Sequence, residues 1–376
     1  MQNNMVGIIT FHCSDNYGAM LQAYGLKTYL RSQGILADLV PYEPFFMVGR
    51  SWFIPFAPVG DLCGDLRYSF WGLCSHIKMG RDFFRMKSNM KKFRERYLVE
   101  KKRKKLRYAG QMKRLGYSCY IVGSDQIWNP DITFGLRKVY FGDFKNSQKR
   151  KVIAYAASLG GSSLLSEYGE AFSNMMNHVD VVSVREKEAV PYVEKYCTKK
   201  VSVMLDPVFL LGEEYWRKVE VLPEKTHYIL VYRTEENQEM IDYVKELSEK
   251  TGLSVVELKV NHENNEHGFM LDYTAGPSEF LGYIRKADYV VSNSFHAVAF
   301  SIIYEKRFMA FLHSNRGARI RNILEVCNLK DRLYQEKTRI EINREIPWKE
   351  AKKNLREEIC CAQDFLGEYL SGDSQW

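Results

Sequence analysis

The chain has 376 residues, of which 45% are hydrophobic and 14% aromatic, and its formal net charge at pH 7 is +8. This length exceeds one compact core and predicts two domains, while the apolar content excludes general disorder. No apolar run is long enough for a transmembrane helix, and Met5 to Phe11 is too short for a signal segment. The eight cysteines lack C-x-x-C spacing, so we expect a cytoplasmic protein with reduced thiols.

Strands and helices alternate through the first half of the chain. The predicted strands there are 6–11, 37–40, 117–122, 151–156, 179–184 and 201–205. The predicted helices between them are 17–33, 164–177 and 186–195. Short apolar, β-branched strands separated by helices are typical of a parallel sheet covered on both faces.

An insertion at residues 43–110 interrupts this pattern. Its first part is aromatic, and from Lys78 to Arg107 it holds fourteen Lys/Arg against three Asp/Glu, a balance of +11 that leaves −3 for the rest of the chain. No RNA-binding or zinc-finger pattern is present, so we expect no nucleic acid partner. Aromatic residues beside a basic run suit peripheral contact with a membrane surface, and a helical flap packed on the protein itself is the alternative.

The same alternation restarts after a polar region at 212–225. The predicted strands are 228–232, 254–259, 289–292 and 307–311, and the helices are 237–250, 278–286, 296–304, 319–326 and 348–370. We therefore expect an α/β fold of two Rossmann-like, doubly wound domains facing a cleft. The expected domains are 1–210, with the insertion, and 211–345, and segment 346–376 is expected to pack across their junction.

The run from Asp288 to Phe300 reads as a buried strand entering a helix, with Ser292, Asn293 and Ser294 as candidate N-caps and His296 in the first turn. The free N–H groups at a helix start favour an anion, and an imidazole adds a charge that can be switched. This pattern predicts a phosphate or carboxylate site. A capped core helix with a histidine near its start is the alternative.

Charged side chains also follow other predicted strands. Asp125 ends a strongly apolar strand and fits a general base acting on a hydroxyl, although it could instead cap the next helix. Arg185 follows the strand at 179–184 and suits a carboxylate or phosphate, unless it simply pairs with Glu186. Arg316 and Arg319 follow the strand at 307–311 and add cations to the second half.

Several segments together resemble the polysaccharide pyruvyl transferase family. They are Gly7–His12, Asn16–Tyr24, Val122–Asn129, Ser183–Glu186, Leu205–Pro207, Ser294–Ala297 and the late Arg319–Arg332 pattern, and the resemblance runs from residue 7 to about 333. Each motif is weak alone, and their order makes the set more specific. The family is similar in architecture to the two-Rossmann-domain, B-type glycosyltransferases.

The resemblance implies transfer of a pyruvyl group from phosphoenolpyruvate to two sugar hydroxyls, giving a cyclic ketal and phosphate. It implies that His296 and Arg185, with Ser294 and either Arg316 or Arg319, bind the donor, and that Asp125 and His296 are catalytic. On the acceptor side, a sugar or lipid-linked glycan, we expect Asn16, Tyr17 and Trp128. Cationic side chains can neutralise the donor, so we expect no metal and no cofactor.

Two other functions fit parts of the sequence. A metal-independent glycosyltransferase using a nucleotide sugar is one, because a helix N-terminus suits a pyrophosphate equally well. The other is a glycan-binding protein without catalytic activity. The presence of Asp125, Arg185 and His296 argues against it. The first strand–helix turn, Phe11 to Ala19, has no dinucleotide or P-loop motif.

Overall fold

The structure, a computed structural model, describes residues 5–57, 62–99, 103–144, 150–161, 167–262, 267–336, 340 and 344–370. The chain divides into two compact units. Unit 1 comprises Met1–Cys74, Lys92–Leu211 and Ile359–Trp376, and unit 2 comprises Ser75–Lys91 and Gly212–Glu358. Each unit contains one parallel β-sheet with helices between its strands, which confirms the predicted α/β class.

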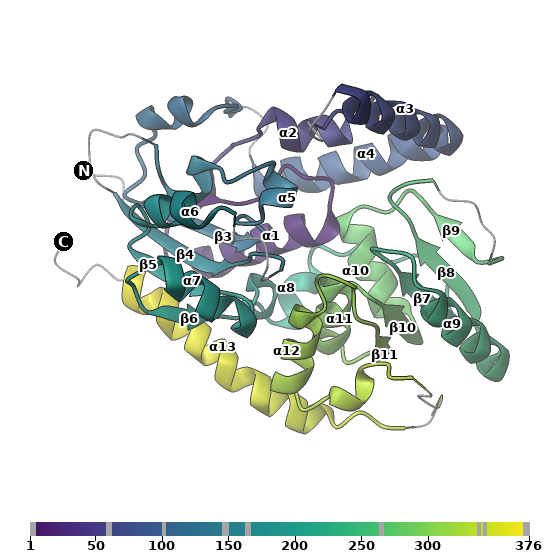
Figure 1. Cartoon of the computed structure of the whole chain (residues 1–376). Helices are drawn as coiled ribbons and strands as arrows, with labels where there is room; N and C mark the ends of the chain where they lie inside the picture. The colour runs from purple at the N-terminus through teal and green to yellow at the C-terminus, as the bar shows by residue number, and fades with distance from the viewer. Residues whose placement is uncertain are drawn as a thin grey trace. The chain divides into compact units, whose positions relative to one another are not determined.

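The sheet of unit 1 has six parallel strands in the order β2-β1-β3-β4-β5-β6 (Figure 1). They are β1 Val6–Ile9, β2 Ala37–Leu39, β3 Cys119–Asp125, β4 Lys151–Ala157, β5 Val181–Val184 and β6 Val201–Val203. Successive residues of a strand point to opposite faces of the sheet. Ile8 and Ile9 are both completely buried, so both faces are covered, as a doubly wound sheet requires.

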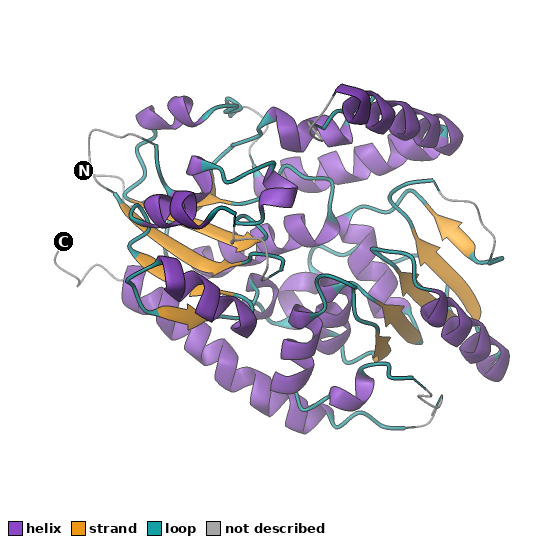
Figure 2. Cartoon of the chain, in the orientation of Figure 1, coloured by secondary structure: helices purple, strands orange, loops and turns teal. Residues whose placement is uncertain are grey.

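Helices lie on both sides of this sheet (Figure 2). They include α1 Tyr17–Ser32, α2 Phe45–Val48, α5 Pro130–Thr133, α6 Gly169–Met176 and α7 Val190–Tyr196. Helix α1 begins at Asn16, whose side-chain oxygen accepts a hydrogen bond from the backbone N–H of Ala19 at 2.9 Å. The predicted start of a helix near Leu164 lies outside the described residues.

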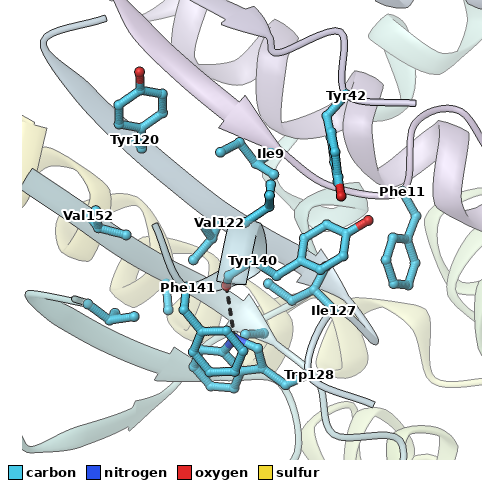
Figure 3. Close-up of a cluster of buried hydrophobic side chains, with 14 of the residues drawn as sticks. Ile9, Phe11, Tyr42, Tyr120, Val122, Ile127, Trp128, Tyr140, Phe141 and Val152 are labelled. Carbon is cyan, nitrogen blue, oxygen red and sulfur yellow. Dashed lines mark hydrogen bonds between the residues drawn. The ribbon is translucent and has the colours of Figure 1, made fainter. Parts of the chain in front are cut away.

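One core cluster of unit 1 surrounds Trp128 (Figure 3). Its indole stacks on Phe141 with ring centroids 5.5 Å apart, and its Nε1–H donates to the carbonyl of Tyr140 at 3.1 Å. Side chains from neighbouring strands, including Ile9 and Val122, pack in the same cluster. This packing holds the turn that follows β3 against the sheet.

The sheet of unit 2 has five parallel strands in the order β11-β10-β7-β8-β9. They are β7 Tyr228–Tyr232, β8 Ser254–Leu258, β9 Met270–Asp272, β10 Tyr289–Ser292 and β11 Arg307–Ala310. The helices are α8 Glu213–Arg217, α9 Gln238–Thr251, α10 Pro277–Lys286, α11 Phe295–Ile303 and α12 Ala318–Val326. Ile229, Leu230 and Val231 are all completely buried, so this sheet too is covered on both faces.

Each sheet has a topological switch point, where the chain stops adding strands on one side and continues on the other. In unit 1 it lies between β1 and β3, and in unit 2 between β7 and β10. In open α/β sheets, ligands bind outside the carboxyl ends of the strands at such a point. These two places are therefore where the structure favours binding sites.

The insertion forms two long helices, α3 Leu62–Met79 and α4 Arg81–Phe93, and each contributes residues to both units. Its middle part, Ser75–Lys91, belongs to unit 2, and two hydrogen bonds connect it to the rest of that unit. The hydroxyl of Ser75 accepts from the backbone N–H of His262 at 2.9 Å, and the amide of Asn89 donates to the carbonyl of Thr274 at 3.0 Å.

The C-terminal helix α13, Trp348–Leu370, likewise contributes to both units. Its first residue, Trp348, lies against Phe308 of unit 2, with ring centroids 6.4 Å apart. Towards its end Phe365 contacts Tyr155 of unit 1, and the carbonyl of Tyr369 accepts a hydrogen bond from Lys151 at 2.9 Å. Among the described residues, none of the helices is long and apolar enough to cross a membrane.

Candidate functional site

In unit 1, Asp125 ends β3 beside the switch point, at the place the sequence predicted for a general base. It adopts the left-handed backbone conformation, with φ of +74°, which is strained for a residue with a side chain. Its carboxylate accepts a hydrogen bond from the backbone N–H of Gln126 at 2.8 Å. The turn is therefore built to hold the Asp125 side chain in a fixed direction.

The turn depends on the two residues before Asp125. Gly123 has φ of +117°, and a Cβ there would lie 2.3 Å from the carbonyl oxygen of Tyr155, so only glycine fits. The hydroxyl of Ser124 donates to Ala156 at 2.8 Å, and Thr10 donates to the carbonyl of Ser124 at 3.1 Å. These bonds tie the ends of β1, β3 and β4 together at the switch point.

Arg185 follows β5 and is enclosed by carboxylates of its own unit. Its Nη1 forms a hydrogen-bonded ion pair with Asp206, its Nε lies 3.6 Å from Glu186, and its Nη2 lies 4.0 Å from Asp125. Burial alone would lower the pKa of Arg185, but the three carboxylates outweigh it and leave the pKa raised. The guanidinium stays charged and holds Asp125 on one side and Asp206 on the other.

The sequence left open whether Arg185 binds a donor or pairs with Glu186. In the structure its strongest partner is Asp206, which the resemblance included in a motif but to which it gave no role. Glu186 lies further from Arg185 and accepts a hydrogen bond from Ser158. The structure thus gives Arg185 a positioning role for Asp125, and donor binding by Arg185 stays a prediction.

His12 is a residue that sequence reasoning did not select for the site. It lies just beyond β1, across the switch point from Asp125, and is completely buried. Its Nδ1–H donates to the carbonyl of Thr10 at 3.2 Å, and within the described part of the chain its Nε2 has no hydrogen-bond partner. Burial, together with the charge of Arg94, lowers the pKa of His12 to about 3, so the ring is neutral.

Arg94, from the basic part of the insertion, holds the loop that contains His12. Its guanidinium donates to the carbonyls of His12 and Cys13, and pairs with Asp15 at 2.7 Å. Burial raises the pKa of the Cys13 thiol to about 12, so a thiolate nucleophile is disfavoured there. Part of the basic run therefore has a structural function in unit 1.

The three residues expected on the acceptor side differ in exposure. Asn16 is exposed at the start of α1, whereas Tyr17 and Trp128 are completely buried. In this structure the two rings have no surface to offer a sugar, and they support the turns that carry Asn16 and Asp125. A role in acceptor binding stays a prediction for all three.

In unit 2, the predicted anion site lies at the start of α11, immediately after β10. Asn293 accepts hydrogen bonds from the backbone N–H and the hydroxyl of Thr234, at 2.8 and 3.2 Å, and so joins the turn after β7 to the turn after β10. Among the residues described, the side chain of Ser294, the N-cap residue, makes no capping bond to the helix. His296, in the first turn, is 8% exposed.

The predicted cations after β11 lie in the same unit. Arg316 and Arg319 are half-buried, and the Arg319 guanidinium lies over the ring of Phe295, 5.7 Å from its centroid. Burial lowers the pKa of His313, and the nearby charges of Arg316 and Arg319 add to this effect, while Glu235 opposes it. Arg319 is thus joined to α11 through Phe295, the neighbour of His296.

Two further buried cations flank the same switch point, and the sequence analysis missed both. Arg233, after β7, donates to Glu257 at 2.6 Å and pairs with Glu236. Lys259, after β8, lies 3.1 Å from the same Glu257. A single charge after each of two strands forms no recognisable motif, and the pairing becomes evident only in the folded sheet.

No cluster of three His, Cys, Asp or Glu side chains in the described ranges is arranged to hold a metal ion. The segment between His262 and His267 lies mostly outside those ranges. Each unit has a candidate site of its own, made of charged side chains near its switch point. In unit 1 the prominent group is a carboxylate, and in unit 2 it is a set of cations around a helix start.

The sequence matches the family described as polysaccharide pyruvyl transferase over residues 16–315. Since the match spans most of the chain, the protein belongs to the polysaccharide pyruvyl transferase family. The predicted resemblance is confirmed, and membership implies a transferase that acts in polysaccharide pyruvylation. A comparison with curated proteins finds no match in sequence.

Solved structures share the fold at low sequence identity. A protein described as a UDP-N-acetylglucosamine 2-epimerase from Listeria monocytogenes has a TM-score of 0.50 at 11% identity, over 97% of this chain and 89% of that chain. The corresponding Neisseria meningitidis epimerase has a TM-score of 0.47 at 12% identity, over 97% and 92%. The first of these identifies the fold as the two-sheet, Rossmann-like architecture of B-type glycosyltransferases, as predicted.

Proposed function

We propose that the protein transfers a pyruvyl group from phosphoenolpyruvate to two hydroxyls of one sugar in a polysaccharide or glycan precursor. The products are a cyclic ketal and inorganic phosphate. The proposal rests on the start of α11, at the switch point of unit 2. The N-cap residue Ser294 makes no side-chain hydrogen bond to the helix there, and His296 is buried in the first turn. A dianionic phosphate suits such a helix start.

Unit 2 supplies the groups for the donor in this proposal. The backbone N–H groups at the start of α11, Ser294 and His296 bind its phosphate, and Arg316 or Arg319 binds its carboxylate. Phosphoenolpyruvate carries up to three negative charges, so several cationic contacts are needed. No metal or cofactor enters the proposed reaction.

The proposed reaction begins at the methylene carbon of the donor. A proton adds to the methylene carbon of the donor, which becomes a methyl group and leaves positive charge on the carbon that carries the phosphate. The first sugar hydroxyl attacks that carbon and loses its proton. The C–O bond to phosphate breaks and phosphate leaves with the bonding electron pair. The second hydroxyl closes the ring, and its proton goes to the departing phosphate, so that the proton freed by the first hydroxyl balances the one added to the methylene carbon.

Asp125 of unit 1 takes the proton from the attacking hydroxyl. Its strained turn and its hydrogen bond from Gln126 fix the carboxylate, and Arg185 and Asp206 lie behind it. A general base of this kind contributes about 10²–10⁴ in rate. Asn16, at the adjacent strand end, is the proposed contact to the acceptor sugar, and a lipid-linked glycan is one acceptor of this class.

Mass spectrometry of the acceptor tests this proposal. The full-length protein is incubated with phosphoenolpyruvate and a panel of sugars and glycans, with and without nucleotide sugars. The proposal predicts that an acceptor gains the mass of one pyruvate less one water and that one phosphate is released per ketal. Asp125→Asn should lower this rate by about 10²–10⁴.

The matched control for that variant is Asp131→Asn, because Asp131 lies a few residues further along, in the short helix α5, and is exposed. It should retain the full rate. Transfer of a whole sugar from a nucleotide sugar, with no ketal formed, would contradict the proposal and identify a glycosyltransferase. Full activity of Asp125→Asn would show that Asp125 is not the general base.

A further inference from the structure

Helix α3 exposes a row of large apolar side chains. Leu66, Phe70 and Ile77 are 62%, 60% and 60% exposed, and their spacing of four and seven residues puts them on one helix face. Trp71, beside this row, is 66% exposed. Monomeric soluble proteins rarely expose such a continuous apolar surface, which marks an interaction site.

The loop before α3 packs on another side of the helix, because Gly72 lies about 240° around the helix axis from Leu66. Gly72 of α3 lies so close to Pro55 that a Cβ on the glycine would be 2.2 Å from the proline ring. The loop therefore packs against the helix, and its own Phe53 and Ile54 are 39% and 58% exposed beside it. We call Leu66, Phe70, Trp71 and Ile77 together the α3 face, in which the ring centroids of Phe70 and Trp71 lie 5.9 Å apart.

Basic side chains flank the α3 face. Arg67 and Lys78 are exposed, and their separation of eleven residues, close to three helical turns, puts them on one line along α3. Arg81 and Arg85, at the start of α4, are exposed as well. From residue 62 to residue 99 the sequence has nine Lys/Arg against three Asp/Glu, so the surroundings are strongly positive.

We propose that the α3 face binds the surface of an anionic lipid bilayer, with its aromatic and aliphatic side chains at the level of the headgroups. Interfacial helices combine an apolar face containing Trp, Phe and Leu with Lys and Arg beside it, as α3 does. The basic flank is complementary to anionic headgroups. In a symmetric dimer the basic flanks of the two copies would face and repel each other, so a second copy of the chain is disfavoured as the partner of the α3 face.

This inference goes beyond the proposed function and does not depend on it. It brings the protein to a membrane surface whichever sugar it modifies. If the acceptor is a lipid-linked glycan, the same contact also raises the local concentration of that acceptor. Neither α3 nor any other helix in the described ranges has the apolar length to span the bilayer, so the contact lies in the interface.

Co-sedimentation with vesicles tests the proposal on the full-length protein. Vesicles of phosphatidylcholine alone are compared with vesicles that also contain phosphatidylglycerol, at low and high salt. The protein should bind the anionic vesicles and detach as salt rises. Phe70→Ser combined with Trp71→Ser should lower the partition coefficient at least tenfold, and Arg67→Gln and Lys78→Gln about fivefold each.

The control is Leu36→Ser combined with Tyr192→Ser, which removes exposed apolar side chains of unit 1 from outside the α3 face. It should bind like the wild type, and circular dichroism checks that every variant is folded. The proposal is overturned if the wild type binds neither vesicle, or if all three α3 variants bind as well as the control. It is also overturned by a dimer in light scattering that Phe70→Ser disrupts in the absence of any vesicle binding.

Discussion

Arg185 and Asp206 form an ion pair in the interior of unit 1, with 2% and 0% of their side-chain surfaces exposed. The two residues lie at the ends of neighbouring strands, β5 and β6. Asp206 also accepts a hydrogen bond from the backbone N–H of Val208 at 3.1 Å, which fixes its carboxylate. Arg185 is in turn held beneath Asp125, the proposed base, so the ion pair links the sheet to the reacting group.

This relationship predicts that Asp206→Asn destabilises the protein although Asp206 contacts no substrate. Asp206→Asn removes the nearest of the three carboxylates around the buried Arg185 and leaves Glu186 and Asp125, so the loss should stay below the roughly 3–5 kcal/mol of a fully broken buried pair. Urea denaturation should show this loss, and the rate of pyruvyl transfer should fall with it. The exposed pair of Glu213 and Arg217 is the control, and Glu213→Gln should leave the stability close to that of the wild type.

The double variant Arg185→Met with Asp206→Leu separates structure from catalysis. Replacing both partners of a buried pair with apolar residues is often close to neutral for stability. We therefore expect most of the stability to return while the activity does not, because Asp125 has lost its neighbour. Recovery of activity in the double variant would show that Arg185 serves neither Asp125 nor the donor.

His12 predicts an acid-sensitive component of stability. Its pKa is lowered to about 3 in the folded protein, against about 6.5 when unfolded, so the unfolded state binds the proton more readily between these values. The stabilisation is complete above about pH 6.5 and is lost as the pH falls towards 3, by an amount on the order of 5 kcal/mol.

His12→Asn tests this component, because its amide can replace the hydrogen bond to Thr10 but does not titrate. Unfolding free energies are measured from pH 4 to 7.5 for both proteins. The wild type should lose stability more steeply than the variant as the pH falls. Parallel curves would mean that His12 is protonated without cost, which its complete burial opposes.

The position of Glu257 between Arg233 and Lys259 leads to a prediction for unit 2. The Glu257 side chain is 1% exposed, so Glu257→Gln leaves two buried positive charges close together. We expect a loss of about 3–5 kcal/mol in stability. Phosphoenolpyruvate or phosphate should restore part of it if these cations reach the donor.

The control for this prediction is Glu246→Gln, which breaks an exposed pair with Lys250 on α9. Its effect should be below about 1 kcal/mol and insensitive to phosphate. A Glu257→Gln protein that loses stability and gains nothing from either anion would limit the Arg233 and Lys259 pair to a structural role.

Chelation gives a fourth prediction. The proposed donor groups are Arg, His and backbone N–H groups, which bind phosphate without a metal. Pyruvyl transfer should therefore continue at an unchanged rate after dialysis against EDTA. A complete loss of activity that a divalent ion restores would contradict this part of the proposal.

Local patterns made the bounds of several elements predictable. Strands β7 and β10 have the predicted ends, because short apolar runs there are closed by polar residues, and α13 begins and ends where its amphipathic pattern does. Strand β9 was missed, since it has only three residues and follows a polar loop. The left-handed turn at Asp125 was not predicted either, because an apolar strand pattern carries no information on the backbone conformation of the residue that ends the strand.

The environment of the site residues depended on contacts between distant segments. Trp128 follows a strand end, where exposure was expected, but Phe141 and Phe172 enclose it. The Arg185–Asp206 pair joins residues 21 apart through adjacent strands, and periodicity carries no information on such pairs. Residue types at strand ends could therefore be predicted, but their partners and burial could not.

The binding of phosphoenolpyruvate to the wild type and to His296→Ala tests directly whether the donor binds at the start of α11. A ligand at 100 times its dissociation constant adds about 2.7 kcal/mol of stability, which a thermal shift detects. The account predicts a shift with phosphoenolpyruvate that His296→Ala abolishes and His267→Ala preserves. A shift with nucleotide sugars only, or one unchanged in His296→Ala, would contradict it.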